Sequence, residues 1–411
     1  MNREKIFSLA ERWNEYFIYG FIFFTPVGHG GAAVCFGFLA LCFVLRKIVR
    51  PDFHFLEKSE NLWLLLFFVF CALSLFNSGP YLQKSLKALF FKWSEYILVF
   101  LLVREALAQP AKLKRVGQAI LIVATIIAID SFIQFFWGSD LFYSRQLLLD
   151  PGFRAITATF KNSNDLASYL GFVIMVPLAM AVAAPTQKAR WILGMLTLVL
   201  GICLLLTFSR GGWLGFLGGL FLMILVSRRW KVLLPVLFLF IVAILMNSSI
   251  AERAIADLPL GAGQQTGGLS DRSKIWGMGF QLIRENPLLG KGLGTFMDYC
   301  GQRLLTVSAN YAHNCYLQIW AESGIFSLVF FLLFVVTIFW KGIAAFKKQE
   351  NALLLGLLCG LFAFLIHSFF DTQLYSVSQS FLFWSMLGVF AAATQNTSGP
   401  SGTSGPGSTP E

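Results

Sequence analysis

Three side chains suited to phosphate and proton chemistry stand beside the apolar stretches of this chain rather than inside them. Arg210 lies in the turn 207–213, where flanking glycines would let a ligand approach the backbone. Arg272 lies in the polar segment 248–323, and its planar guanidinium can hydrogen-bond two phosphate oxygens at once. His313 lies near the end of that segment, and an imidazole that titrates near neutrality can take a proton from a hydroxyl. These residue types fit the activation of a hydroxyl beside a phosphate group.

Each of the three also has an ordinary structural interpretation. Arg210 could be an arginine that snorkels to the membrane surface from a helix end. Arg272 taken alone could be a solvated surface charge, and His313 taken alone could be a hydrogen-bonded residue of the interface. The residue types by themselves leave these interpretations open.

Weaker candidates for holding a substrate lie in a basic, amide-rich stretch. Arg154 and Lys161 belong to this stretch, which leads directly into an apolar segment. Asn164 or Asp165 would cap the helix that begins there, because a side-chain oxygen at this position accepts a hydrogen bond from the first turn. The two cations would then stand at the end of a membrane helix.

A second set of polar residues follows His313 at helical spacing. Asn314, Gln318 and Glu322 are four residues apart. A helix that begins near Ala309 would carry His313 and present those three on one polar face. Its apolar face would lie at the membrane interface, as in amphipathic interfacial helices. Glu322 is therefore a further weak candidate for positioning a substrate.

A histidine and an aspartate lie one helical turn apart further along the chain. His367 and Asp371 are at positions i and i+4 where an apolar stretch ends. Residues at this spacing are neighbours on a helix surface, so we expect a supporting hydrogen bond between them.

The elements that must hold these residues are transmembrane helices. The sequence is 57% hydrophobic and 13% charged, and its mean hydropathy is +0.70. Water-soluble domains do not have this composition. Apolar stretches of about 15 to 22 residues recur, and in a bilayer they form helices because every backbone N–H and C=O needs a partner within the segment. We therefore predict an all-α polytopic membrane protein.

About twelve transmembrane helices are expected. Most of the 32 Lys and Arg residues fall in alternate short connections, so the positive-inside rule places both chain ends in the cytoplasm. The same distribution explains the net charge of +11 without a nucleic-acid partner. The predicted helix ranges are 15–27, 31–45, 62–76, 88–103, 116–137, 165–184, 192–207, 211–226, 232–247, 324–340, 352–370 and 378–394.

Two connections on the opposite side are long. Segment 138–164 is the shorter one, and 248–323 should contain short helices, one of which starts at 270–276 and stops at 285–287. Function often concentrates in long loops on a rigid frame. The expected organisation is nine helices in 1–247, the large loop in 248–323, three helices in 324–394 and a disordered Gly/Ser/Pro/Thr-rich tail in 395–411.

Other sequence features indicate packing rather than chemistry. Gly211, Gly215 and Gly219 are spaced to form a face on which another helix packs closely. The seven cysteines include no C-x-x-C pair, and only Cys300 and Cys315 could form a disulfide outside the membrane. Motifs of soluble nucleotide-binding proteins, zinc proteases and serine hydrolases are absent from the sequence.

Four segments, taken in order, resemble the O-antigen ligase and O-antigen polymerase superfamily. Together they span residues 154–371, whereas the first 140 residues match only as hydrophobic helices. The chain is most similar to an O-antigen ligase. The four segments are Arg154 to Leu166, Ser-Arg-Gly-Gly-Trp at 209–213, the stretch from Arg272 to Gly294, and Ala-His-Asn-x-Tyr-Leu-Gln at 312–318.

The resemblance implies a GT-C-like glycosyltransferase that works at the periplasmic face of the inner membrane. Such an enzyme transfers a glycan from undecaprenyl diphosphate to a hydroxyl of lipid A-core oligosaccharide, with inversion and without a metal or other cofactor. Carried onto this chain, the resemblance makes His313 the general base and gives the diphosphate to Arg210 and Arg272. The weaker candidates for positioning substrate are Arg154, Lys161 and Glu322.

Other functions remain open at this stage. A polymerase of the same superfamily needs the same donor chemistry and differs only in its acceptor. A protein O-oligosaccharyltransferase often has a further soluble C-terminal region, whereas a short polar tail follows the last predicted helix here. A transporter or flippase for a polar lipid would show two related halves and charges at the bilayer midplane. The sequence shows no such repeat, and its charges gather at one face, which favours an enzyme.

Overall fold

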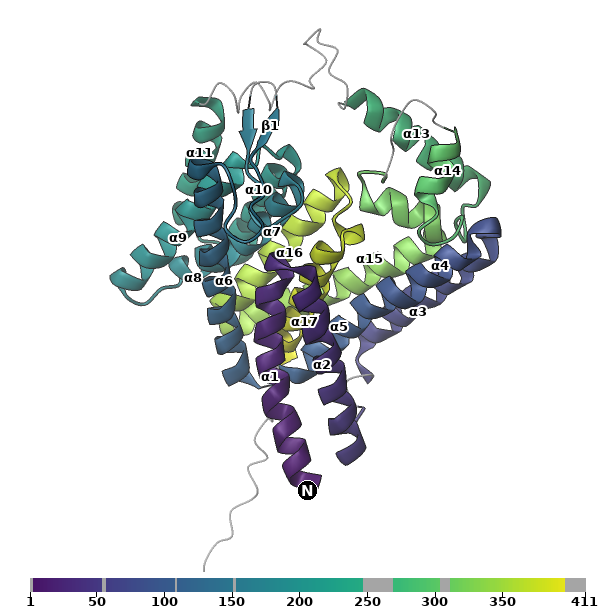
Figure 1. Cartoon of the computed structure of the whole chain (residues 1–411). Coiled ribbons are helices and arrows are strands. Elements are labelled where there is room, and N and C mark those ends of the chain that lie inside the picture. The colour runs from purple at the N-terminus through teal and green to yellow at the C-terminus, as the bar shows by residue number, and fades with distance from the viewer. Residues whose placement is uncertain are drawn as a thin grey trace, which may run out of the picture.

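The computed structural model describes residues 3–53, 57–107, 109–150, 153–246, 269–303 and 311–395. Within these residues the fold is a bundle of helices with one small β-hairpin (Figure 1). The tail that was predicted to be disordered and two parts of the large loop lie outside the described residues.

One helical segment in the N-terminal part of the chain contains a π-helical turn between two α-helices. The π-helix η4 (Leu89–Trp93) joins α4 (Leu82–Ala88) to α5 (Ser94–Ala106), so the three form one continuous helical segment. The short 3-10 turns η2 (Ser74–Asn77) and η3 (Gly79–Tyr81) precede it. The other helices of this part are α1 (Arg3–Val27), α2 (His29–Val49), α3 (Ser59–Leu73) and α6 (Pro110–Trp137).

The segment after α6 contains a β-hairpin that the all-α prediction did not include. Strands β1 (Leu148–Asp150) and β2 (Phe153–Ala155) pair antiparallel, with Leu148 opposite Ala155. Strands of three residues are too short to show the alternation of apolar and polar residues that identifies a strand in a sequence.

The remaining helices come from the second part of the chain, which begins at α7. Each of the twelve predicted ranges overlaps a helix of the structure. The predicted stop of the loop helix at 285–287 is confirmed, because α13 ends at Glu285. The elements are α7 (Ser163–Val173), α8 (Met175–Val182), α9 (Gln187–Leu206), α10 (Arg210–Ser227), α11 (Trp230–Met246), α13 (Leu269–Glu285), α14 (Phe296–Arg303), α15 (Cys315–Gln349), α16 (Ala352–Phe370), the 3-10 turn η5 (Gln373–Tyr375) and α17 (Val377–Gln395).

In the described part of the chain, nine helical segments are long and apolar enough to cross a membrane. The three predicted ranges outside this set fall on α1, on the segment α4–η4–α5 and on α11. In α1, Glu11 and Arg12 lie just before the predicted range 15–27 and Glu15 begins it, so the uncharged part of this helix is short. The second segment is divided by its π-turn, and α11 has 17 residues. Apart from the short β-hairpin, the described part of the chain is helical, and its long apolar helices fit a multi-pass membrane protein.

The centre of the bundle is formed by α7–α8, α16 and α17. About four fifths of the apolar window of α17 is buried inside the protein, whereas most of α2 and α9 faces outward. The predicted glycine face on α10 is confirmed: a Cβ on Gly215 would lie 2.6 Å from the Ala363 carbonyl oxygen of α16. Close contact between α10 and α16 brings the N-terminus of one helix beside the C-terminus of the other.

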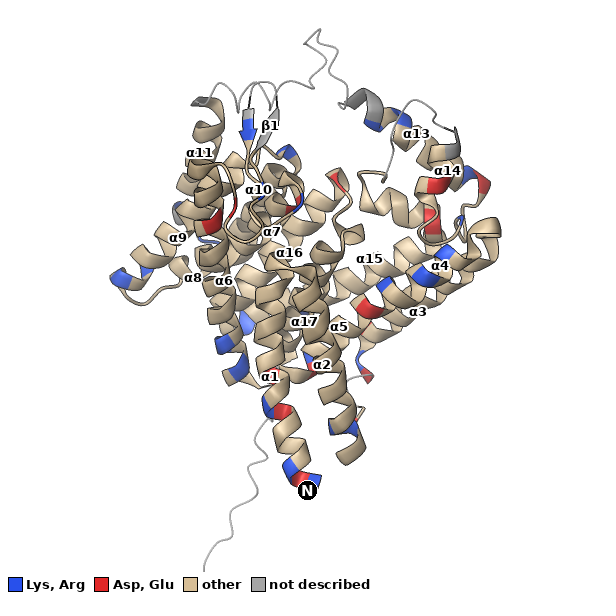
Figure 2. Cartoon of the chain, in the orientation of Figure 1, with Lys and Arg blue, Asp and Glu red and all other residues tan. Residues whose placement is uncertain are grey.

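Charged residues are concentrated towards the ends of the helices. Figure 2 shows Lys and Arg on α1, α2 and α6 at the end of the molecule where the N-terminus lies. The sequence analysis assigned this end to the cytoplasm. The candidate residues gather at the opposite end, where α16 ends and α15 begins (Figure 1).

Candidate active site

His313 lies just before α15 and not on a helix. The helix begins at Cys315, and the Asn314 side chain caps it by accepting hydrogen bonds from two backbone N–H groups of the first turn, both at 3.0 Å. His313 itself has a φ of 47°, so the chain turns sharply ahead of the cap. The prediction that a helix carries His313 is wrong, because Asn314 caps the helix and its first residue is Cys315, two positions after His313.

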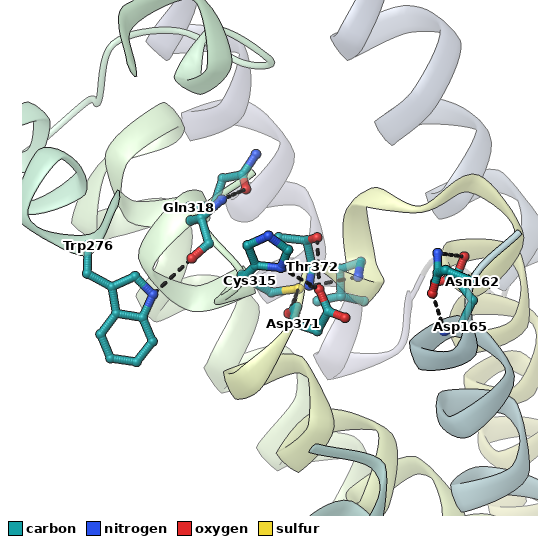
Figure 3. Close-up of polar contacts among 10 residues, drawn as sticks. Asn162, Asp165, Trp276, Cys315, Gln318, Asp371 and Thr372 are labelled. Carbon is teal, nitrogen blue, oxygen red and sulfur yellow. Dashed lines mark hydrogen bonds and ion pairs between the residues drawn. The ribbon is translucent and has the colours of Figure 1, made fainter. Parts of the chain in front are cut away.

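The turn that holds His313 is fixed from two sides. The backbone N–H of Ala312 donates to the Gln318 side chain at 3.1 Å, and the Ala312 carbonyl accepts from the Trp276 indole at 2.9 Å (Figure 3). Gln318 in turn donates to Glu322 at 3.1 Å, and both side chains are buried. The polar face of this helix therefore points into the protein, and the prediction of an interfacial helix is corrected.

His313 is hydrogen-bonded to Asp371. The His313 Nδ1 lies 3.0 Å from Asp371 Oδ1, and the same oxygen accepts from the Thr372 backbone N–H at 2.8 Å (Figure 3). Asp371 is the C-cap of α16 and has an extended backbone, so its side chain leaves the helix surface. The expected bond from His367 to Asp371 is not formed, and His367 Nδ1 has no hydrogen-bond partner among the described residues.

The environment of Asp371 favours its ionised form. Burial alone would raise the pKa of this carboxyl, but the hydrogen bond from His313, the imidazoles of His367 and His313 and the Thr372 N–H outweigh that effect and lower it. An ionised carboxylate can only accept hydrogen bonds, so the His313 Nδ1 carries the hydrogen. In the neutral imidazole the lone pair is then on Nε2, which is the nitrogen that can act as a proton acceptor.

The His313–Asp371 pair lines an open cavity of about 780 Å³. The His313 side chain is 38% exposed there, whereas that of Asp371 is 11% exposed, so the imidazole is the accessible member of the pair. The cavity is bordered by the starts of α2, α7 and α17, the π-helix η4, and the turn η5. Figure 3 shows Asn162 and Asp165 at the start of α7, across from Asp371. Elements far apart in the sequence thus form its walls.

The two arginines expected to bind phosphate lie around the last turn of α16. Arg210 is the first residue of α10, and a Cβ on the next residue, Gly211, would lie 2.7 Å from His367 Cδ2. Arg272 lies near the start of α13, and its positive charge acts electrostatically on His367. Asp371 directly follows this turn of α16. The arginines and the His313–Asp371 pair therefore share one helix end, although neither arginine is among the described residues that line the cavity.

The weaker candidates lie in three different surroundings. Lys161 is exposed and lines the cavity. Arg154 is exposed on β2 and is not among the lining residues. Glu322 is buried in α15, where its carboxylate accepts hydrogen bonds from the backbone N–H of Gly294 at 2.9 Å and of Phe296 at 3.3 Å. Glu322 thus holds the loop ahead of α14 rather than facing the cavity.

The N-cap of α7 differs from the expected one, and the structure answers the question that the sequence left open about two cysteines. Asn162, and not Asn164 or Asp165, caps α7 by accepting from the Asp165 backbone N–H at 2.8 Å. Cys300 and Cys315 are buried thiols that are not joined by a disulfide.

Part of the chain, including three of the candidate residues, matches a known protein family. Residues 195–332 match the family model described as O-antigen ligase. Over these residues the chain is similar to the O-antigen ligase family. The match covers roughly a third of the chain and includes Arg210, Arg272 and His313. No curated protein matches the chain.

This similarity supports a membrane enzyme of the O-antigen ligase type. The arrangement at the end of α16 fits such chemistry, because His313 is hydrogen-bonded to Asp371 on the wall of an open cavity, and two arginines lie around the last turn of the same helix. Asp371 lies outside the residues that match the O-antigen ligase model, so the fold completes the site from beyond that domain.

Sequence reasoning missed three residues of the cavity. Lys92, Arg145 and Gln373 all line it. Lys92 could have been found, because it is the one basic residue inside the predicted helix 88–103. Ionisable residues within membrane helices usually face a cavity or the bundle interior. Arg145 and Gln373 lie in connections whose course the sequence does not reveal.

Proposed function

We propose that this chain is an O-antigen ligase of the bacterial inner membrane, with its active site at the periplasmic face. It would transfer a glycan from undecaprenyl diphosphate to a hydroxyl of lipid A-core oligosaccharide. The observation that carries the proposal is the hydrogen bond between His313 and Asp371 on the wall of an open cavity, beside two arginines of the family domain.

In this mechanism His313 is the general base. Its Nε2 takes the proton from the acceptor hydroxyl while the hydroxyl oxygen forms a bond to the anomeric carbon of the donor. The bond from that carbon to the diphosphate breaks on the opposite face, so the sugar configuration inverts and undecaprenyl diphosphate leaves with the electron pair. Asp371 keeps the imidazole in the required tautomer and stabilises the cation that forms.

Arg210 and Arg272 are assigned to the donor diphosphate. Guanidinium groups bind phosphate oxygens with charge-assisted hydrogen bonds, and they stabilise the charge that develops on the leaving group. Lys161 would contact substrate from the cavity wall. Roles in substrate positioning for Arg154 and Glu322 stay predictions, and Glu322 would act only through the loop that it holds.

We also propose twelve membrane spans with both chain ends in the cytoplasm. The additional spans would be α1, the segment α4–η4–α5 and α11, whose apolar residues face outward at many positions. An even number of spans agrees with the distribution of Lys and Arg between the two sides.

The function is tested with purified protein and an undecaprenyl-diphosphate glycan. One reaction contains lipid A-core, a second contains donor only, and each is run with and without EDTA. A single glycan on lipid A-core, formed equally with EDTA, is the expected product of a metal-independent ligase. Lengthened lipid-linked glycans in the second reaction would instead identify a polymerase. Loss of activity with EDTA would contradict the metal-independent route.

A further inference from the structure

The cavity contains positive charge that the proposed donor site does not use. Lys92 and Lys161 line it, and neither forms an ion pair or hydrogen bond with any of the described residues. The third cation, Arg145, is already engaged, because its guanidinium donates to the Thr159 carbonyl and lies 4.4 Å from the centre of the Tyr143 ring. Two lysine charges are therefore available to a ligand.

The acidic groups of the cavity do not neutralise these lysines through contacts. Asp371 is bonded to His313. Asp165 accepts from the Asn162 amide at 3.1 Å and from the Ser376 hydroxyl at 3.3 Å. The other titratable groups that face the cavity are His29, Tyr143, Tyr311 and Tyr375. Available charge in the cavity is thus positive, which favours an anionic ligand.

A buried amide in the same wall also points to a ligand. Gln373 is only 1% exposed, yet neither its side-chain nitrogen nor its oxygen has a hydrogen-bond partner in the described part of the chain. Buried amide groups without partners are costly, so a partner is expected. Gln373 lines the cavity two residues after Asp371, and its donor and acceptor suit the hydroxyls of a sugar.

The local structure around Lys92 supports a functional position. Lys92 belongs to the π-helix η4, and π-turns inside α-helices often occur at functional sites. The neighbouring Trp93 is buried and its ring contacts Tyr375, another residue of the cavity wall. A lysine that stands in a membrane helix and reaches a cavity is best explained by a ligand in that cavity.

We propose that Lys92, Lys161 and Gln373 form the acceptor subsite, and that this subsite takes a saccharide bearing a phosphate group. The inference rests on the proposed function, because that function assigns the donor diphosphate to the arginines at the end of α16. The lysines bind the phosphate of the acceptor, and the Gln373 amide binds a sugar hydroxyl close to His313. A cavity of about 780 Å³ is large enough for a short oligosaccharide.

Steady-state kinetics test the lysines. The acceptors are lipid A-core with its phosphate groups and the same material after enzymatic removal of phosphate. For Lys92→Gln and Lys161→Gln we expect KM for the phosphorylated acceptor to rise roughly tenfold, as for the loss of one charge-assisted hydrogen bond. KM for the dephosphorylated acceptor, KM for the donor, and kcat should stay near the wild-type values. Lys92→Arg should retain most of the affinity for the phosphorylated acceptor.

Two controls make this result specific. Lys87→Gln removes an exposed lysine of the same helical segment that does not line the cavity, and it should behave as wild type. Gln373→Leu should raise KM for both acceptor forms by a similar factor, because it removes a contact with a hydroxyl. Equal losses on both acceptors in the lysine variants, or a rise in KM for the donor instead, would overturn the assignment.

A binding measurement separates this proposal from the proposed function. Wild-type protein without donor should bind the phosphorylated acceptor more tightly than the dephosphorylated one, and Lys92→Gln should lose that preference. This result supports the subsite even if no glycan is transferred in the enzymatic assay. The absence of any preference in the wild type refutes the subsite even if transfer occurs.

Discussion

The bond between His313 and Asp371 determines which ring nitrogen is available at the cavity. With the carboxylate on Nδ1, the lone pair is on Nε2, and the left-handed backbone at His313 holds the ring at the end of α15 rather than along it. In the proposed mechanism the acceptor hydroxyl therefore approaches from the cavity side. The proposed chemistry depends on one accessible imidazole and one largely buried carboxylate.

Replacement of the base should abolish transfer without unfolding the protein. In His313→Ala we expect kcat to fall by about 10²- to 10⁴-fold, the usual contribution of a positioned general base. KM for the donor should change little. Single-turnover assays check the rate, and thermal unfolding in detergent checks the fold. Turnover at the wild-type rate would refute the role of His313.

Replacement of its partner should lower the rate in a way that pH cannot rescue. The lowered pKa of Asp371 means that folding favours the carboxylate, so its contribution is present above the ordinary aspartate pKa and is lost only as the pH falls through the lowered value. In Asp371→Asn we therefore expect kcat to drop by about 10²- to 10⁴-fold at both pH 6 and pH 9. A variant that regains its activity at high pH would contradict this. Asp298→Asn is the control outside the cavity.

The arginines should affect the donor rather than the acceptor. We expect Arg210→Ala and Arg272→Ala to raise KM for the donor roughly ten- to hundredfold and to lower kcat, because their bonds to phosphate strengthen as the leaving group departs. Arg284→Ala is the matched control, since Arg284 is exposed at the far end of α13. Initial rates at varied donor concentration decide the matter. Unchanged donor kinetics in both variants would remove the arginines from the mechanism.

At the scale of elements, one loop is pinned to α15 through a buried carboxylate. Glu322 accepts from two backbone N–H groups of this loop, and Gly324 has a φ of 83° at a break within α15. A Cβ on Gly324 would lie 2.0 Å from the Leu288 carbonyl oxygen, so only glycine fits there. The first part of α15, which follows His313, is thus tied to the loop between α13 and α14.

This arrangement predicts that Glu322 matters for stability. In Glu322→Ala the buried N–H of Phe296 and the partly buried N–H of Gly294 lose their acceptor, and we expect a loss of about 1–3 kcal/mol for each. Glu322→Gln keeps one acceptor oxygen and should lose less. Thermal unfolding in detergent compares the three proteins. An alanine variant that unfolds at the wild-type temperature would show that the loop is held in another way.

The sequence predicted helices better than it predicted their irregularities. Apolar stretches mark a membrane helix because lipid requires one, and the predicted start at 324 coincides with the break at Gly324. Hydropathy carries no information about the π-turn at 89–93, since the turn changes hydrogen bonding and not composition. Hydropathy also could not show that the helix after His313 turns its polar face inward. A polar helix face can lie in water or in a buried hydrogen-bond network, and the sequence pattern is the same in both cases.

The cavity is a property of the whole molecule. Its walls come from residues near positions 28, 92, 161, 313 and 371, and only the packed bundle brings these together. Sequence analysis found His313 and Lys161 by residue type. It paired Asp371 with the wrong histidine because helical spacing applies only inside a helix, and α16 ends at Phe370. The opposite end of the molecule contains several ion pairs, among them Arg104 to Glu60 at 3.1 Å.

The proposed orientation can be tested by labelling cysteines in whole cells. All seven native cysteines are buried, so the parent chain should give little background. Ser376→Cys faces the cavity and should react with a membrane-impermeant maleimide in cells whose outer membrane alone is permeable. Ser59→Cys, at the end that we assign to the cytoplasm, should react only after the inner membrane is opened. The reverse pattern would invert the topology.

The π-helix at 89–93 also bears on how such a site can arise during evolution. A π-turn holds one residue more than the α-helical turn that it replaces. Because the extra residue is absorbed within the turn, α4 and α5 on either side keep the faces with which they pack. Insertion of a single codon is therefore enough to re-aim one side chain toward the cavity while the rest of the bundle is unchanged. Diversification of acceptor specificity can proceed through such one-residue insertions as well as through substitutions.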